Sequence, residues 1–167
     1  MKTVVIVAGC ESYRTADFLQ AASLLRLETV VATDAPAPIE GVGGHLEVDL
    51  NDAVGAAEQI AAAVPDARAV VAVDDGSVEV AALAAEVLGL PHNSPDAVAA
   101  TRDKLLMRRL LATAGVAQPA FADAEPGEVP RAAAEVGYPV VVKPTGLSAS
   151  RGVIRLDNPR DAARTEA

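Results

Sequence analysis

The stretch GYPVVVKPTGLSASRGV, residues 137–153, decides how this 167-residue chain is organised. Its three valines at 140–142 form a short β-branched run between two prolines, which predicts a strand covered on both faces. Lys143 ends the run, so its ammonium group is expected at the rim of a sheet, where ligand clefts of α/β proteins lie. A second strand is predicted at 153–156, after an intervening loop.

The loop after Lys143 is built of small residues among which Arg151 lies. Little bulk lets backbone amides and hydroxyl groups approach an anion, and we interpret the loop as a triphosphate site with Lys143 as a point charge. The alternative is a solvated lysine followed by a serine-glycine hairpin turn, and the stretch alone leaves both open. The small residues are Gly146, Ser148, Ala149, Ser150 and Gly152.

Composition bounds the class of protein. With 167 residues, 51% of them hydrophobic, the chain can bury a core as one ordinary domain or two small ones. No apolar run is long enough to span a bilayer and the first residues lack the pattern of a secretion signal, so we expect a cytoplasmic protein. The single Cys10 excludes a disulfide framework, and His45 and His92 add no metal-ligand spacing.

Charge changes sign along the chain. Residues 1–100 carry 4 Lys and Arg against 15 Asp and Glu, whereas residues 101–167 carry 10 against 8. The acidic total argues against binding to nucleic acid or a membrane surface. The change of sign favours a second part that faces an anion, although acidic helix faces could simply solubilise the first part.

The first ninety residues alternate between predicted strands and helices. Each apolar or alternating run is followed by a helical stripe with a cap, which predicts a parallel, doubly wound α/β half-domain. The alternation of polar and apolar residues puts 45–50 at an edge, and the apolar run 69–73 in the interior. The predicted strands are 3–8, 29–33, 45–50 and 69–73; the predicted helices are 14–26, one capped by Asn51 and one from Ser77 to Gly89.

Nucleotide and substrate motifs of parallel α/β proteins lie just after the strands. After the first strand AGCESYRT offers a single glycine where a dinucleotide fold has GxGxxG, so NAD and FAD are not expected. Asp74 and Asp75 follow the fourth strand. They could bind a substrate amine, or form a solvated turn that leads to the Ser77 cap.

PHNSP at 91–95 marks the predicted boundary between domains at 1–93 and 94–167. A helical region follows to about Gly115, in which Leu106, Leu110 and Ala114 are predicted to face a core. Lys104 lies on the flank of this stripe and can extend its charge to the edge. A strand is predicted at 119–122 and a helix at 129–136.

The segment TRDKLLMRRLLATAGVAQPAFA (101–122), followed after a spacer by 137–153, resembles the start of the ATP-grasp fold of carboxylate-amine ligases. The preceding half-domain resembles the Rossmann-like domain that comes before that fold. VEVAALAAEVLGLPHNSPDAVAATRDK (78–104) is most similar to the amino-acid ligase branch, with glycinamide ribonucleotide synthetase and biotin carboxylase types as more distant relatives.

The resemblance implies a function for two lysines and the loop. Lys104 and Lys143 would contact ATP phosphates, and a mobile loop would close over the triphosphate. ATP would phosphorylate a small-molecule carboxylate, which an amine then attacks, and loop closure would protect the acyl phosphate from water. A homodimer is compatible with this interpretation. The implied loop residues are Ser148, Ala149, Ser150, Arg151, Gly152 and Val153.

Asn158 is predicted to cap a final helix, and the sequence stops at Ala167 without a signal for the end of that helix. We therefore expect an N-terminal portion of a longer protein. The resemblance implies that this protein is a ligase whose adenine-binding segment and Mg²⁺ ligands lie downstream, so that the portion alone would be inactive. Two alternatives belong to other classes. A receiver-like domain would need an acidic pair after the first strand, where residues 8–10 are Ala, Gly and Cys. A non-catalytic nucleotide- or small-molecule-binding α/β module stays open.

Overall fold

The computed structural model describes residues 2–36 and 43–164. The chain divides into two compact units, unit 1 at residues 1–99 and unit 2 at residues 100–167. None of the described helices combines the length and the apolar character needed to cross a bilayer.

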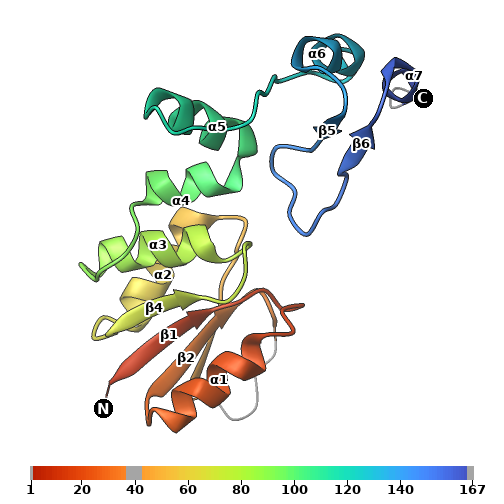
Figure 1. Cartoon of the computed structure of the whole chain (residues 1–167). Coiled ribbons are helices and arrows are strands. Elements are labelled where there is room, and N and C mark those ends of the chain that lie inside the picture. Colours follow the sequence, from red (N-terminus) through yellow and green to blue (C-terminus); the bar gives the residue numbers. More distant parts are fainter. Residues whose placement is uncertain (1, 37–42, 165–167) are drawn as a thin grey trace. The chain divides into compact units, whose positions relative to one another are not determined.

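Unit 1 contains a four-stranded parallel sheet with the strand order β3-β2-β1-β4 (Figure 1). The β-branched run of β1 lies at its centre, where Val5 faces Val30 of β2 and Val70 of β4 in register and is fully buried. The predicted parallel α/β sheet and its edge strand are confirmed. The strands are β1 (Thr3–Val7), β2 (Glu28–Thr33), β3 (Gly44–Glu47) and β4 (Ala69–Ala72).

Strand β4 was predicted to be interior, and this is wrong for the described sheet, in which β4 pairs with β1 alone. Its apolar side chains are only partly buried, apart from Val73 just beyond the strand. An apolar run therefore indicates that helices cover the faces of the strand. It does not indicate whether a second strand is hydrogen-bonded to each edge.

Helices cover both faces of the sheet, as the doubly wound prediction requires (Figure 1). On one face α1 (Thr15–Leu24) packs Phe18 and Leu19 against Ile6 and Val31. On the other, α2 (Ala53–Ala63) and α3 (Val78–Val87) share a core with β1. Burial of a side chain such as Ile60 contributes about 1.5–3 kcal/mol.

The helix ends of unit 1 correct one capping prediction and confirm another. Asp52, and not Asn51, caps α2, because its carboxylate accepts from the backbone N–H of Gly55 at 3.0 Å. Asn51 instead donates to the Asp49 carboxylate. Helix α3 ends at Gly89 with φ +65°, the left-handed conformation that glycine adopts without strain.

Unit 2 is built around a hairpin in which β5 (Val140–Val142) pairs antiparallel with β6 (Ile154–Leu156). Its inner face packs Val140 and Leu156 against α6 (Val129–Val136) and α7 (Pro159–Ala163). On the outer face Val141 is 52% exposed, so the prediction of a strand covered on both faces is wrong within the described residues.

The helical region of 94–115 consists of two helices, α4 (Pro95–Arg102) and α5 (Lys104–Thr113), separated at Asp103. The predicted core stripe on α5 is wrong, since Leu106 is 41% and Leu110 49% exposed. The amphipathic pattern is present in the sequence, but the described residues bring no apolar surface that buries it.

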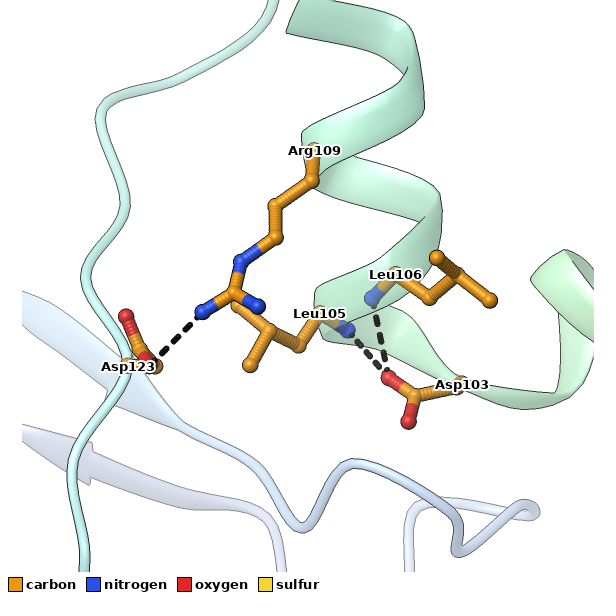
Figure 2. A network of polar contacts seen from close by, with 5 residues as sticks. All are labelled: Asp103, Leu105, Leu106, Arg109 and Asp123. Carbon is orange, nitrogen blue, oxygen red and sulfur yellow. Dashed lines mark hydrogen bonds and ion pairs between the residues drawn. The ribbon is translucent and has the colours of Figure 1, made fainter.

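The predicted strand at 119–122 is also wrong, because these residues form an irregular segment. Pro119 lacks the N–H that a ladder needs, and side chains tie the segment to α5 instead. Gln118 donates from Nε2 to the Arg108 carbonyl at 2.8 Å, and Arg109 pairs with Asp123 at 3.0 Å (Figure 2).

Candidate functional site

Lys104 begins α5 and directs both of its donors at one loop. Its backbone N–H donates to the Thr145 carbonyl at 3.0 Å. Its ammonium group donates to the same oxygen at 3.3 Å and to the Leu147 carbonyl at 2.5 Å. Because Thr145 and Leu147 come shortly after Lys143, the fold brings a lysine from the start of a helix to the loop that the second lysine opens.

Asp103 caps the helix that carries Lys104. Its Oδ1 accepts from the backbone N–H groups of Leu105 at 2.8 Å and Leu106 at 3.0 Å (Figure 2). The first three N–H groups of α5 therefore have acceptors, one from Thr145 and two from Asp103. The positive charge here comes from the ammonium group, because no N–H of this first turn is left for an anion.

The loop after Lys143 folds back on itself. Ala149, Ser150 and Gly152 have φ values of 55°, 59° and 68°. Each non-glycine residue in this left-handed region costs about 1–3 kcal/mol. At Gly152 a β-carbon would lie 2.7 Å from Cγ of Pro144, so only glycine fits where the two ends of the loop meet.

The loop carries uncompensated positive charge. Within the described residues no carboxylate forms an ion pair with Lys104, Lys143 or Arg151. Lys143 is exposed, and no described residue accepts a hydrogen bond from its ammonium group. Arg151 donates from Nε to the Ser148 carbonyl at 3.4 Å, a neutral acceptor. This arrangement suits a polyanionic ligand.

The acids that follow the loop in sequence are used for local structure. Asp157 accepts from Arg155 at 2.8 Å, and Asp161 accepts from the Asp157 N–H at 3.1 Å and from Asn158 Nδ2 at 2.9 Å. The part of the chain that the structure describes holds no group of three metal-ligating side chains. Asp157 and Asp161 therefore do not fit a Mg²⁺ site.

Several acids follow the strands at the carboxyl edge of the sheet in unit 1. Asp74, after β4, accepts from the Gly9 N–H at 3.3 Å, and Asp34, after β2, accepts from the Cys10 N–H at 2.6 Å. Desolvation, and then the hydrogen bond and charge of Asp34, raise the pKa of the Cys10 thiol. Asp75 is exposed beside this turn.

Asp34 was not singled out in the sequence, although the signal was present. It directly follows a predicted parallel strand, as Asp74 does, and carboxyl ends of parallel strands share one edge. Asp34 also lines an open concavity of about 540 Å³ in unit 1. The concavity contains none of the residues expected to bind ATP; its lining is Asp34, Glu47, Val48, Asp49 and Gln59.

No family model and no curated protein sequence matches this chain. Solved structures do match it. An L-amino acid ligase from Bacillus licheniformis is 22% identical, with a TM-score of 0.75 over 99% of this chain and 41% of its own. An N5-carboxyaminoimidazole ribonucleotide synthetase in complex with ADP is 16% identical, with a TM-score of 0.76 over 99% and 43%. The Staphylococcus aureus N5-carboxyaminoimidazole synthetase, also with ADP, is 18% identical, with a TM-score of 0.73 over 99% and 44%.

The chain thus spans about two fifths of the length of the solved proteins that it matches. At identities this low the likeness establishes the fold. The predicted α/β fold is confirmed, because the chain shares the fold of about two fifths of each of these solved enzymes.

Proposed function

We propose that these residues form part of the nucleotide site of an ATP-dependent ligase that joins a carboxylate to an amine. Lys104 and Lys143 bind phosphate oxygens of ATP, and residues 148–153 lie over the triphosphate. The observation that carries the proposal is the contact of Lys104 with the carbonyls of Thr145 and Leu147, which joins two lysines remote in sequence to one loop.

Two further observations support a nucleotide. No described carboxylate pairs with Lys143 or Arg151 near this loop. The fold is shared with proteins that were solved with ADP or ATP bound. A ligand with several negative oxygens would use this charge, whereas a neutral metabolite would not.

The reaction proceeds in two steps. A carboxylate oxygen attacks the γ-phosphorus of ATP, the bond to the bridging oxygen breaks, and ADP leaves with that electron pair. The amine then attacks the acyl carbon, inorganic phosphate leaves, and the nitrogen loses a proton. Lysine ammonium groups contribute by offsetting charge on the phosphate oxygens, and a closed loop contributes by excluding water from the acyl phosphate.

The proposed ligase also needs a metal ion, an amine substrate and a cellular compartment that holds ATP. Mg²⁺ is expected to accompany ATP, held by carboxylates outside the described residues. Asp74 and Asp75 are proposed to meet the amine substrate, with the turn after β1 ordered by the contact of Asp74 with Gly9. We place the protein in the cytoplasm, where ATP and reduced cysteine are both found.

The test uses the natural protein that contains these residues. ADP and ATP binding is measured by titration calorimetry, and phosphate release is measured with a panel of amino acids. Tight nucleotide binding with phosphate release that depends on one amino acid is expected. Nucleotide binding without turnover under every substrate pair would favour a non-catalytic module. Failure to bind nucleotide at all would refute the ligase and leave a module that binds another small molecule.

A further inference from the structure

The break between α4 and α5 is not dictated by helix propensity. From residue 96 to residue 114 the chain contains neither proline nor glycine, and its residues favour one continuous helix. Yet Asp103 leaves the helical region, with φ −113° and ψ 111°. Something other than a helix breaker must stabilise the interruption.

The contacts at Asp103 identify what stabilises it. In an uninterrupted helix the Lys104 N–H would donate to the Ala100 carbonyl, four residues back. Because Asp103 is extended, the Lys104 N–H instead donates to the Thr145 carbonyl. The carboxylate of Asp103 accepts from the next two backbone N–H groups, those of Leu105 and Leu106 (Figure 2). At the break, hydrogen bonds of a continuous helix are therefore replaced by the Asp103 cap and by the bond from Lys104 to the loop.

The same exchange determines where the Lys104 ammonium lies. Because the backbone N–H of Lys104 is held on the Thr145 carbonyl, the side chain starts beside the loop and reaches the carbonyls of Thr145 and Leu147. Continuing the helix through Asp103 would remove the backbone bond and turn the lysine away from that oxygen.

We propose that Asp103 is a positioning residue for Lys104. By capping α5 it sets the break that delivers the ammonium to residues 145–147, and it contacts neither nucleotide nor substrate itself. The consequence for nucleotide affinity rests on the proposed function, whereas the consequence for the loop does not.

The first arm of the test needs no nucleotide. Trypsin cleavage after Arg151 is followed by mass spectrometry; Lys143 precedes a proline and is not cut. Asp103→Ala is expected to accelerate this cleavage by about 2-fold to 30-fold, the range that a lost helix cap gives. Lys104→Met should do the same, and Asp103→Asn, which keeps a capping oxygen, should stay near the wild-type rate.

The second arm measures the ADP dissociation constant of the natural protein. Asp103→Ala should weaken binding, Asp103→Asn should restore it, and Asp103→Ala added to Lys104→Met should change nothing more, because Asp103 acts through the lysine. Asn158→Ala is the matched control. It removes the equivalent cap of α7, where Asn158 accepts from the N–H groups of residues 160 and 161, and should leave both readouts unchanged.

The outcomes separate the two hypotheses. A wild-type cleavage rate in Asp103→Ala, or an additive double variant, would overturn the positioning role. An equal effect of Asn158→Ala would also overturn the positioning role, because the loss of any helix cap would then have the same effect through general stability. If the wild-type protein bound no ADP, the proposed function would fail while the cleavage arm still decided the role of Asp103.

Discussion

Substitution of Lys143 by methionine tests the nucleotide site with the least disturbance of the fold. The side chain is exposed, and its ammonium group has no acceptor among the described residues. Methionine keeps the length of the stem and removes the charge. Because no folded-state contact is lost, we expect the free energy of unfolding to change by less than about 0.5 kcal/mol.

The effect on binding follows from the lost phosphate contact. A hydrogen bond to a charged group contributes about 1.5–3 kcal/mol, and about 1.4 kcal/mol corresponds to a tenfold change in affinity. Since Lys143 is exposed, solvent screening favours the lower part of this range. The ADP dissociation constant should therefore rise about 10-fold to 30-fold.

The assay is calorimetric titration of ADP into wild-type and variant natural protein, with thermal unfolding as the check on folding. Arg131→Met serves as the control. Arg131 is also an exposed cation of unit 2, but its charge is paired with Glu128 at 3.4 Å and Glu135 at 2.8 Å. A Lys143→Met dissociation constant within twofold of wild type, or an equal loss in Arg131→Met, would refute the assignment of Lys143 to the phosphates.

Three further predictions concern other parts of the molecule. Asp34→Asn should lower the raised pKa of the Cys10 thiol and so speed its alkylation by iodoacetamide at pH 8, because the negative charge beside the thiol is removed; an unchanged rate would show that the charge of Asp34 does not raise the pKa. Gly152→Ala should destabilise the protein by about 1 kcal/mol or more in thermal unfolding, since φ is +68° and the new β-carbon would lie 2.7 Å from Pro144. Gly146→Ala, where no atom lies within 4 Å of the new β-carbon, should be nearly neutral, and equal effects would contradict the geometry. The 167 residues alone should not release phosphate from ATP with Mg²⁺ and amino acids, because the acids after the loop are held in local contacts; steady turnover would contradict this.

The parallel sheet could be predicted because its information is local. Runs such as 3–8 and 29–33 are apolar and β-branched, and each is followed by a helix with a recognisable end. Predictions failed where a partner decides the outcome. PAFA at 119–122 has the composition of a strand, yet the flanking Gln118 and Asp123 bond to α5, and no strand in the described residues pairs with it.

The candidate site could be predicted only in part, for the same reason. The composition of the loop and the lysine at the end of β5 could be recognised directly. The position of Lys104 could not, because helical periodicity placed it on the flank of a stripe, whereas its backbone N–H bonds to Thr145, 41 residues later. A long-range carbonyl acceptor leaves no pattern around the donor, and Asp103 carries no helix-breaking signal of the kind that proline or glycine gives.

The pairing of charges in the structure distinguishes the two interpretations of the loop, a triphosphate site and a solvated turn. Residues 101–167 carry 10 cations, but an arginine such as Arg131 is neutralised by acids on its own helix, and Arg155 by Asp157 two residues away. Around the loop, Lys104 bonds only to carbonyl oxygens, whose partial charge leaves a net positive field. A phosphate oxygen 4 Å from one such cation gains about 1 kcal/mol in water and about 4 kcal/mol at an effective dielectric constant of 20. A solvated turn does not need a lysine bonded to its carbonyls beside a second lysine without an acid partner, whereas a triphosphate site would use both charges. If this interpretation is right, nucleotide affinity should fall as ionic strength rises.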